Sequence, residues 1–197
     1  MVDRVSETSE AARLARRAVE LGKDDAVLLA HAGHVLGYVA GDLAAGARAW
    51  DLALILNENA AVACGSSAFV KMIMGQHSVA VDHIARAVRL SPRDPQMPAF
   101  HHTTAFANFF LGRYDEAARL KEGVLSVYPG HLGNLRVYAA SLAAAGCLEH
   151  SQKAMARYRE LDPMRTTGNL DQVMPTFGRS EDHDKFVEAL RQAGLPE

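Results

Sequence analysis

Histidine is the residue type in this sequence best suited to metal binding or acid–base chemistry, and the chain contains nine. The placements that could combine ligands or bases are His31 with His34, His101 with His102, His77 with His83, and His183 between Asp182 and Asp184. A spacing of three residues would put His31 and His34 on one helix face. Protein metal sites usually add further His, Cys or carboxylate ligands, and no HExxH or CxxC pattern accompanies these histidines. We therefore predict no metal site.

Nucleophilic chemistry would have to use Cys64 or Cys147, the two cysteines of the chain. Neither lies in a motif that supplies a base, and the sequence contains no Gly-Xaa-Ser-Xaa-Gly pattern and no phosphate-binding loop. Two isolated cysteines give no disulfide framework and are typical of small buried side chains. The sequence thus predicts a protein that is not an enzyme and needs no cofactor.

Composition narrows the classes of partner. The formal net charge is −2, whereas binding to nucleic-acid phosphates needs a concentrated basic surface. The densest basic group, Arg13, Arg16 and Arg17, is typical of a solvated helix face. No run of about eighteen apolar residues could span a bilayer, and the N-terminus has early acids without an apolar signal core. We predict a cytoplasmic protein that binds neither nucleic acid nor membrane.

The elements that position these side chains follow a repeat. Turn glycines separated by 34, 37 and 34 residues are Gly41, Gly75, Gly112 and Gly146. Closing prolines separated by 37 and 34 residues are Pro92, Pro129 and Pro163. Because two independent markers agree, the chain is predicted to consist of stacked helical hairpins. One such hairpin cannot bury its own apolar face, so neighbouring repeats must stack and both ends need a cap.

The second helix of each repeat carries a small residue five positions after the turn glycine and a large residue four positions later. These pairs are Gly46 and Trp50, Ala80 and Ile84, Ala117 and Lys121, and Ser151 and Met155. The pattern and its period resemble the tetratricopeptide repeat (TPR) family, although Lys121 departs from the apolar type. The resemblance implies an all-α fold, a right-handed α-α superhelix (TPR solenoid) of about four helical hairpins with N- and C-terminal extra helices.

The predicted elements form a single TPR solenoid domain, 1–197. They are an N-terminal helix at 5–21, hairpins at 26–56, 60–90, 98–127 and 131–161, an irregular arm at 162–180, and a C-terminal helix at 181–193. The register of the first hairpin is open by one residue. If Gly33 rather than His34 takes the small position, the connecting turn is one residue longer than usual. Whether the C-terminal helix caps the solenoid or fills its groove is also open.

In the TPR family the first helices line a concave surface that binds a segment of a partner. Carrying those positions onto this sequence predicts a partner-binding groove of His31, Val35, Tyr38, Phe69, Met72, His102, Phe106, Phe109 and Arg136, with Val62 beside them. Arg136 is the single fixed cation in this set, so a clamp for two carboxylates is not expected. An apolar or amphipathic protein or peptide segment fits better, because its spaced anchors can insert into a hydrophobic groove.

Two alternatives stay open for the same residues. Phe106, Phe109 and Phe110, together with Met72, would be core if they pack inside the solenoid or under the C-terminal arm. The apolar groove or an exposed end could also pair two copies of the chain into a homo-oligomer.

A closer resemblance rests on the segments GYVAGDL, RAVRLSPRDPQ, LGRYDEAA, RELDP and KFVEALRQAGLPE. Together they resemble the C-terminal TPR region of bacterial, rhizobial-type class III adenylate or guanylate cyclases. This resemblance implies an alternative signalling role, in which the repeats transmit a binding event to a catalytic domain elsewhere. The repeats occupy nearly all residues, so no cyclase activity is assigned to this chain.

Overall fold

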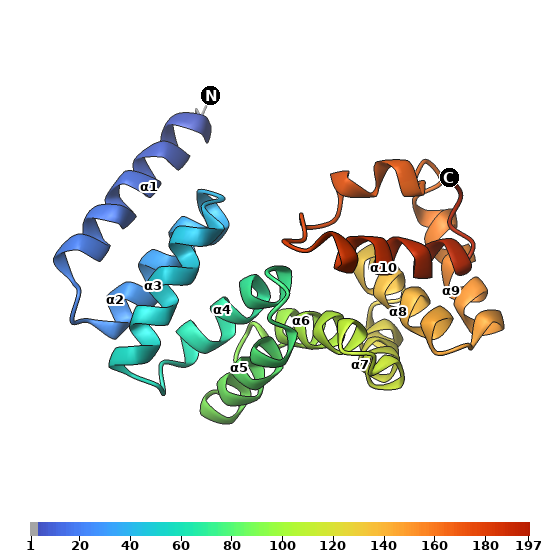
Figure 1. The fold of residues 1–197 in the computed structure, drawn as a ribbon, viewed down its shortest axis with the longest axis horizontal. Coiled ribbons are helices and arrows are strands. Elements are labelled where there is room, and N and C mark those ends of the chain that lie inside the picture. Colours follow the sequence, from blue (N-terminus) through green and yellow to red (C-terminus); the bar gives the residue numbers. More distant parts are fainter. Residues whose placement is uncertain (1–3) are drawn as a thin grey trace. The chain divides into compact units, whose positions relative to one another are not determined.

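The structure is a computed structural model that describes residues 4–197 (Figure 1). Within these residues it contains helices and no β-strand. The elements are α1 Arg4–Leu21, α2 Ala26–His34, the π-helix η1 Val35–Val39, α3 Leu43–Leu56, α4 Ala61–Ile73, α5 His77–Leu90, α6 Met97–Phe110, α7 Tyr114–Val127, α8 Leu132–Ala144, α9 Leu148–Leu161, the 3-10 helix η2 Thr167–Gln172 and α10 Ser180–Gln192. The predicted all-α class is confirmed.

Glycine makes the turn between the two helices of each hairpin. Gly41, Gly75, Gly112 and Gly146 have φ angles of 72°, 80°, 78° and 81°. Residues with a Cβ rarely adopt this left-handed conformation, which reverses the chain after a helix. The second helix of each hairpin begins two residues after its glycine. The repeated glycine therefore sets the repeated hairpin.

The chain forms two compact units. Unit 1 consists of Met1–Lys71 and Asp82–Asp94, and unit 2 consists of Met72–Val81 and Pro95–Glu197. Helices α4 and α5 thus contribute residues to both units. The single domain over 1–197 stays a prediction.

Trp50 on α3 is the centre of the core of unit 1. Its side chain is fully buried, and its Nε1 donates a 3.0 Å hydrogen bond to the carbonyl oxygen of Ala30 on α2. Leu29 and Val70 belong to the same apolar cluster. The hydrogen bond matters because a buried N–H without an acceptor would cost about 1–3 kcal/mol.

Glycines allow α2 and η1 to approach α3 closely. A Cβ added at Gly33 would lie 2.8 Å from Trp50 Nε1, and one added at Gly46 would lie 2.9 Å from the Cα of Gly37. These distances are too short for any larger residue to fit without a shift. Gly33, and not His34, therefore takes the small position of the first hairpin.

The core of unit 2 lies between helices α6 to α9. Ser151 takes the small position of α9, and its Oγ donates a 2.7 Å hydrogen bond to the carbonyl oxygen of Ala139 on α8. Met155 and Tyr158 further along α9 are also buried. Serine permits the close approach of the two helices because its buried hydroxyl has an acceptor.

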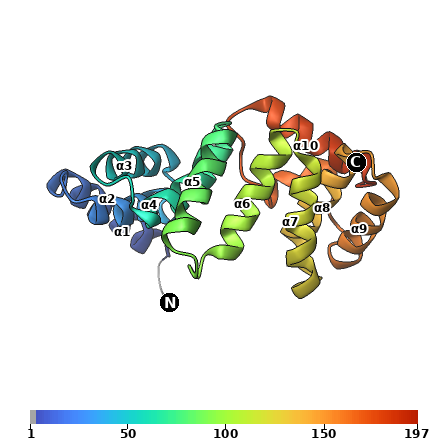
Figure 2. The same cartoon turned by 90° about the horizontal axis from the view of Figure 1, so that it is seen from below.

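The C-terminal segment, residues 163–197, folds back along unit 2 (Figures 1 and 2). The 3-10 helix η2 begins with a capping box, in which the side chains of Thr166 and Asn169 bond each other's backbone. Helix α10 then packs against α8. The buried face of α10 consists of Asp182, Phe186, Val187, Ala189 and Leu190. The amide of Thr167 donates a 2.8 Å hydrogen bond to the carbonyl oxygen of Pro196, which ties the end of the segment to its beginning.

Candidate functional site

The predicted groove residues of unit 1 are His31, Val35, Tyr38 and Phe69. His31 is exposed, whereas Val35 and Phe69 are half-buried. The Tyr38 side chain is 39% exposed, and its ring centroid lies 6.1 Å from that of Phe69 and 5.6 Å from that of Trp50. Tyr38 therefore presents part of its ring to solvent, beside the half-buried Phe69 and next to the fully buried Trp50.

A π-helical turn positions Tyr38. In η1, Val35–Val39, the amide of Ala40 donates a 2.9 Å hydrogen bond to the carbonyl oxygen of Val35, five residues earlier. This turn absorbs the extra residue of the first hairpin. The Tyr38 hydroxyl then reaches α4, where it donates a 2.7 Å hydrogen bond to the carbonyl oxygen of Ser66. Burial raises the pKa of Tyr38, so the phenol stays protonated and keeps this bond.

Other polar side chains of unit 1 pair with one another. The Ser67 Oγ lies 2.7 Å from the Nδ1 of His83, and the Lys71 Nζ lies 2.8 Å from an Asp51 carboxylate oxygen. Burial, followed by the charge of Lys71, lowers the pKa of His83. His83 thus acts as a neutral hydrogen-bonding group between helices α4 and α5.

The remaining predicted groove residues, all in unit 2, are Met72, His102, Phe106, Phe109 and Arg136. Phe106 and Phe109 are buried. The ring of Phe186 on α10 covers them, with centroid distances of 5.1 Å to Phe106 and 5.3 Å to Phe109. Phe177, from the irregular arm before α10, lies 5.2 Å from Phe110. These aromatic side chains form one cluster under the C-terminal segment, and their binding to a partner stays a prediction.

Polar contacts hold the C-terminal segment over the ends of two first helices. The amide of Gly178 donates a 2.9 Å hydrogen bond to the carbonyl oxygen of Ile73 at the end of α4. The Lys185 Nζ donates a 3.1 Å bond to the carbonyl oxygen of Phe110 at the end of α6. Because α10 also packs on α8 (Figure 2), the segment runs over the first helices of unit 2. It occupies the face predicted as a groove.

A buried histidine and a buried carboxylate face each other at the start of α10. His77 Nε2 on α5 lies 3.1 Å from Asp182 Oδ2, with side-chain exposures of 7% and 8%. The two groups are within ion-pair distance but lack the alignment of a good hydrogen bond. Burial lowers the pKa of His77 against the opposing effect of Asp182. The His77 ring also stacks on Phe110, with 4.8 Å between centroids.

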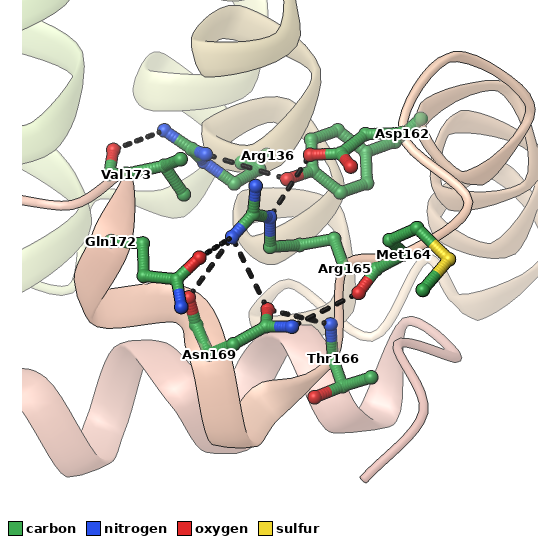
Figure 3. Close-up of polar contacts among 9 residues, drawn as sticks. Arg136, Asp162, Met164, Arg165, Thr166, Asn169, Gln172 and Val173 are labelled. Atoms are coloured by element: carbon green, nitrogen blue, oxygen red, sulfur yellow. Dashed lines mark hydrogen bonds and ion pairs between the residues drawn. The ribbon is translucent and has the colours of Figure 1, made fainter.

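Arg136 on α8 is buried, and within the described residues its guanidinium forms no ion pair (Figure 3). Its Nη2 donates a 2.9 Å hydrogen bond to the carbonyl oxygen of Val173, and its Nη1 lies 3.4 Å from the Tyr158 hydroxyl. The guanidinium also lies over the Tyr158 ring, 5.8 Å from its centroid. The predicted groove cation therefore binds the backbone of the C-terminal segment.

Arg165 fastens the turn that precedes η2 (Figure 3). Its Nε donates a 2.9 Å bond to Asp162 Oδ2, and its Nη1 donates to the carbonyl oxygen of Asn169 at 3.0 Å and to Gln172 Oε1 at 3.2 Å. The Asn169 Nδ2 in turn donates to the carbonyl oxygen of Met164 at 3.0 Å. Side-chain bonds thus organise an arm whose sequence carries little helical signal.

Lys121, the residue that departs from the repeat pattern, is fully buried. Its Nζ lies 2.8 Å from His102 Nδ1 on α6 and 2.8 Å from Asn134 Oδ1 on α8. Burial lowers the pKa of Lys121 to about 7. Burial, followed by the charge of Lys121, lowers the pKa of His102 to about 3. This cluster links α6, α7 and α8. The sequence pattern singles out Lys121 and His102, but it predicts neither the part of Asn134 nor the contact among the three side chains.

The other histidines singled out by the sequence contact aromatic or acidic side chains. His34 packs against Tyr38, with 5.0 Å between ring centroids. His183 lies 3.3 Å from Asp171 and 3.2 Å from Asp184. Within the part of the chain that the structure describes, no three His, Cys, Asp or Glu side chains are grouped to hold a metal ion.

A surface pocket that the sequence did not predict lies between α6 and α7. Its volume is about 460 Å³, and its lining includes Met97, His101, Arg119, Leu120, Val124 and Tyr128. The lining combines apolar side chains with His101 and Arg119, and it does not include the Lys121 cluster.

No protein-family model matches the sequence, and no curated protein matches it. Solved structures do match. The crystal structure of YrrB, a TPR protein with an unusual peptide-binding site, has 20% identity, with 92% of this chain and 91% of that one covered and a TM-score of 0.61. MamA AMB-1 has 18% identity, with 87% and 91% covered and a TM-score of 0.63. MamA 41-end from Desulfovibrio magneticus RS-1 has 14% identity, with 98% and 94% covered and a TM-score of 0.56.

These likenesses establish the fold: the chain has the TPR solenoid fold, and the predicted fold class is confirmed. The three structures do not bear on the cyclase resemblance, which stays a prediction. No helix in the part of the chain covered by the structure combines the length and apolar character needed to cross a bilayer.

Proposed function

We propose that this chain is a non-catalytic protein-interaction module that binds an apolar or amphipathic partner segment on unit 1. The binding surface is the first-helix face formed by His31, Val35, Tyr38 and Phe69. One observation carries the proposal: Tyr38 remains 39% exposed, whereas Phe109, which also lies three residues before its turn glycine, is 0% exposed and covered by Phe186 of α10. The first-helix face of unit 1 is thus left for a ligand from outside the chain.

The chemistry of this surface favours a helical segment with apolar anchors. Tyr38 and Phe69 offer ring surface, Val35 offers an aliphatic edge, and His31 adds a polar, exposed rim. A tyrosine held by a hydrogen bond at its hydroxyl loses little entropy when a partner packs on its ring. The likeness to YrrB, which has a peptide-binding site, supports a peptide segment as the class of ligand.

Two alternative functions would use the same surface of unit 1 with a different partner. A regulatory region of a nucleotide cyclase would use the face to receive or transmit a signal, and a self-association module would bind a second copy. The same variants therefore test the surface in each case, and the identity of the bound chain separates the cases.

The proposal is tested by selecting displayed helical peptides on the full-length chain and measuring their affinity for variants. The double variant His31→Glu with Tyr38→Ser is expected to weaken the selected peptides by about tenfold or more, as expected for a central aromatic anchor. The matched control is Ile55→Ser on α3, because Ile55 is 79% exposed and lies outside the face. Far-ultraviolet circular dichroism and the thermal midpoint report whether the variants stay folded. Trp50 fluorescence is unsuitable for this purpose, because loss of the neighbouring Tyr38 ring changes it directly.

Peptides that bind the double variant and wild type equally would contradict the proposed surface. Selected peptides that lose affinity equally for the Ile55→Ser control would contradict it too. If wild type instead forms a dimer that the double variant abolishes, the face pairs two copies of this chain.

A further inference from the structure

Helix α10 shows what kind of ligand the aromatic face of unit 2 accepts. Phe186 and Leu190 on its inner face are fully buried, four residues apart, as one helical stripe requires. On its outer face, Glu188 pairs with Arg191 at 2.6 Å and both remain exposed. An amphipathic helix of this length is therefore held by its apolar stripe, and its polar face stays in solvent.

Two charged side chains of α10 fix its direction on that face. The Lys185 Nζ lies 3.1 Å from the carbonyl oxygen of Phe110 and 5.4 Å from the centroid of the Tyr114 ring. The carbonyls in the last turn of a helix lack intrahelical partners and attract a cation. Asp182, three residues earlier, lies 3.1 Å from His77. A helix placed in the opposite direction would exchange these charges and lose both contacts.

The docked helix is connected through an irregular arm. Between the end of α9 at Leu161 and the start of α10 at Ser180, the chain contains only the 3-10 helix Thr167–Gln172. One of the anchors is also incomplete, because Asp182 Oδ2 and His77 Nε2 are buried without a well-aligned hydrogen bond. The tether favours α10 only by giving it a high effective concentration near the face. A free helix at sufficient concentration can therefore compete with α10, whose contact with His77 is suboptimal.

We propose that the aromatic face of unit 2, formed by Phe106, Phe109 and Phe110, binds an amphipathic helix of a partner protein, and that α10 is its internal competitor. The partner helix carries the pattern Asp-x-x-Lys-Phe-x-x-x-Leu, which matches Asp182, Lys185, Phe186 and Leu190. The pattern follows from charge and shape complementarity: acid to His77, ammonium to the end of α6, phenyl ring to the aromatic cluster. This site is separate from the proposed surface on unit 1 and does not rest on it.

The test uses the full-length chain and a fluorescent peptide with the sequence of residues 179–197. Phe186→Ala in the chain weakens the internal helix but leaves His77 and the aromatic face intact. The apparent dissociation constant rises in inverse proportion to the open fraction. The peptide is therefore expected to bind the Phe186→Ala chain about tenfold or more tightly than wild type. A peptide with the same Phe→Ala change is expected not to bind.

Glu188→Ala is the matched control, because Glu188 lies on the exposed face of the same helix. Its affinity for the peptide should equal that of wild type. Equal binding of the peptide to wild type and the Phe186→Ala chain, or no binding to a folded Phe186→Ala chain, would overturn the proposal. A dimer of the Phe186→Ala chain with no peptide binding would also overturn it, because a second copy would then be the occupant.

If Phe186→Ala fails to fold, hydrogen exchange of the wild-type chain with and without the peptide tests the same competition. We expect the amides of α10 to exchange by local opening, and an excess of the peptide to speed their exchange while α8 and α9 keep their protection. If α10 exchanges only through global unfolding and the peptide has no effect, α10 is a fixed part of the core and the proposal is wrong. The variants of His31 and Tyr38 should leave this result unchanged, which separates it from the proposed function.

Discussion

The Lys121 Nζ lies 2.8 Å from the Nδ1 of His102, and both groups also contact the Oδ1 of Asn134. The Lys121 side chain is fully buried and has no carboxylate partner among the described residues. A protonated amine there keeps the full cost of desolvation, which is why its pKa falls to about 7. His102 stays neutral near pH 7, so its Nδ1 can accept a hydrogen bond from the lysine.

This relationship predicts that stability rises with pH above neutrality. The unfolded lysine holds its proton up to about pH 10.5, whereas the folded one releases it above about pH 7. Between these values the unfolded state binds more protons, so the free energy of unfolding increases with pH. We expect a gain of about 1–2 kcal/mol from pH 7 to pH 9, below the limit of about 1.4 kcal/mol per pH unit for one proton. Urea unfolding at both pH values measures it.

Lys121→Met is the control for this prediction. Methionine has a similar length and does not titrate. The difference in the free energy of unfolding between pH 7 and pH 9 should therefore shrink, even if the variant is less stable overall because Asn134 loses its hydrogen-bond donor. An unchanged gain in stability from pH 7 to pH 9 in Lys121→Met would contradict the assignment to Lys121. Cys64 cannot produce such a gain, because burial raises the pKa of its thiol and therefore lowers the free energy of unfolding as pH rises.

The sequence predicts the fold class because its main signal is local. The four turn glycines adopt positive φ angles, and a left-handed position followed by a new helix is readable from glycine spacing alone. The sequence also indicates the extra residue of the first hairpin, because either Gly33 or His34 could take the small position. Its accommodation by the π-helix Val35–Val39 was not, because close packing against Trp50 decides it.

The glycine contacts in unit 1 predict opposite effects at two helical positions. A Cβ at Gly46 would lie 2.9 Å from the Cα of Gly37 and 3.0 Å from the Gly33 carbonyl oxygen, whereas a Cβ at Gly123 meets nothing within 4 Å. Gly46→Ala should therefore destabilise the protein by about 1–3 kcal/mol, because backbone cannot move aside locally. Gly123→Ala should stabilise it by about 0.5–1 kcal/mol through helix propensity. Thermal unfolding of both variants measures the difference, and a neutral Gly46→Ala would refute the close contact.

The candidate site was harder to predict than the fold because it depends on long-range docking. Phe106 and Phe109 lie at groove positions by repeat register, and aromatic residues at that spacing suit either a groove or a core. Phe186, about eighty residues later in the chain, decides the matter by packing on both rings. The contact of Arg136 also depends on long-range docking. The repeat register predicts a groove position for Arg136, but the Val173 carbonyl oxygen that it binds belongs to an irregular arm whose path no sequence pattern predicts.

The single tryptophan of the chain provides a test of domain organisation. Trp50 is fully buried in unit 1, so its fluorescence reports unfolding there, whereas circular dichroism reports the helices of both units. One solenoid domain over 1–197 predicts that the two urea curves coincide, as in a two-state transition. Midpoints that differ reproducibly would show that the units unfold separately and that the single-domain prediction is wrong. The Gly123→Ala variant, which lies in unit 2, should then shift only the circular dichroism curve.

The His77–Asp182 contact predicts that acid loosens helix α10. The charged groups facing His77 are Asp182, which favours its protonation, and Arg179 and Lys185, which oppose it. Burial outweighs the carboxylate, so the pKa of docked His77 lies below the value of 6.5 expected when α10 is released. As pH falls through about 6.5, the released state binds more protons than the docked state and docking weakens.

Hydrogen exchange of the α10 amides at pH 7 and pH 5.5, corrected for intrinsic rates, measures this loosening. We expect protection to fall several-fold in wild type, because one released histidine with a pKa of 6.5 limits the change between these pH values to less than about tenfold. His77→Gln should remove most of the difference, since glutamine does not titrate, and His150→Gln at an exposed position of α9 should leave it unchanged. An identical loss of protection in His77→Gln would show that a group other than His77 carries the pH dependence. The His77–Asp182 contact at the start of α10 would then be insensitive to pH, and release of the helix would depend on competition by a partner alone.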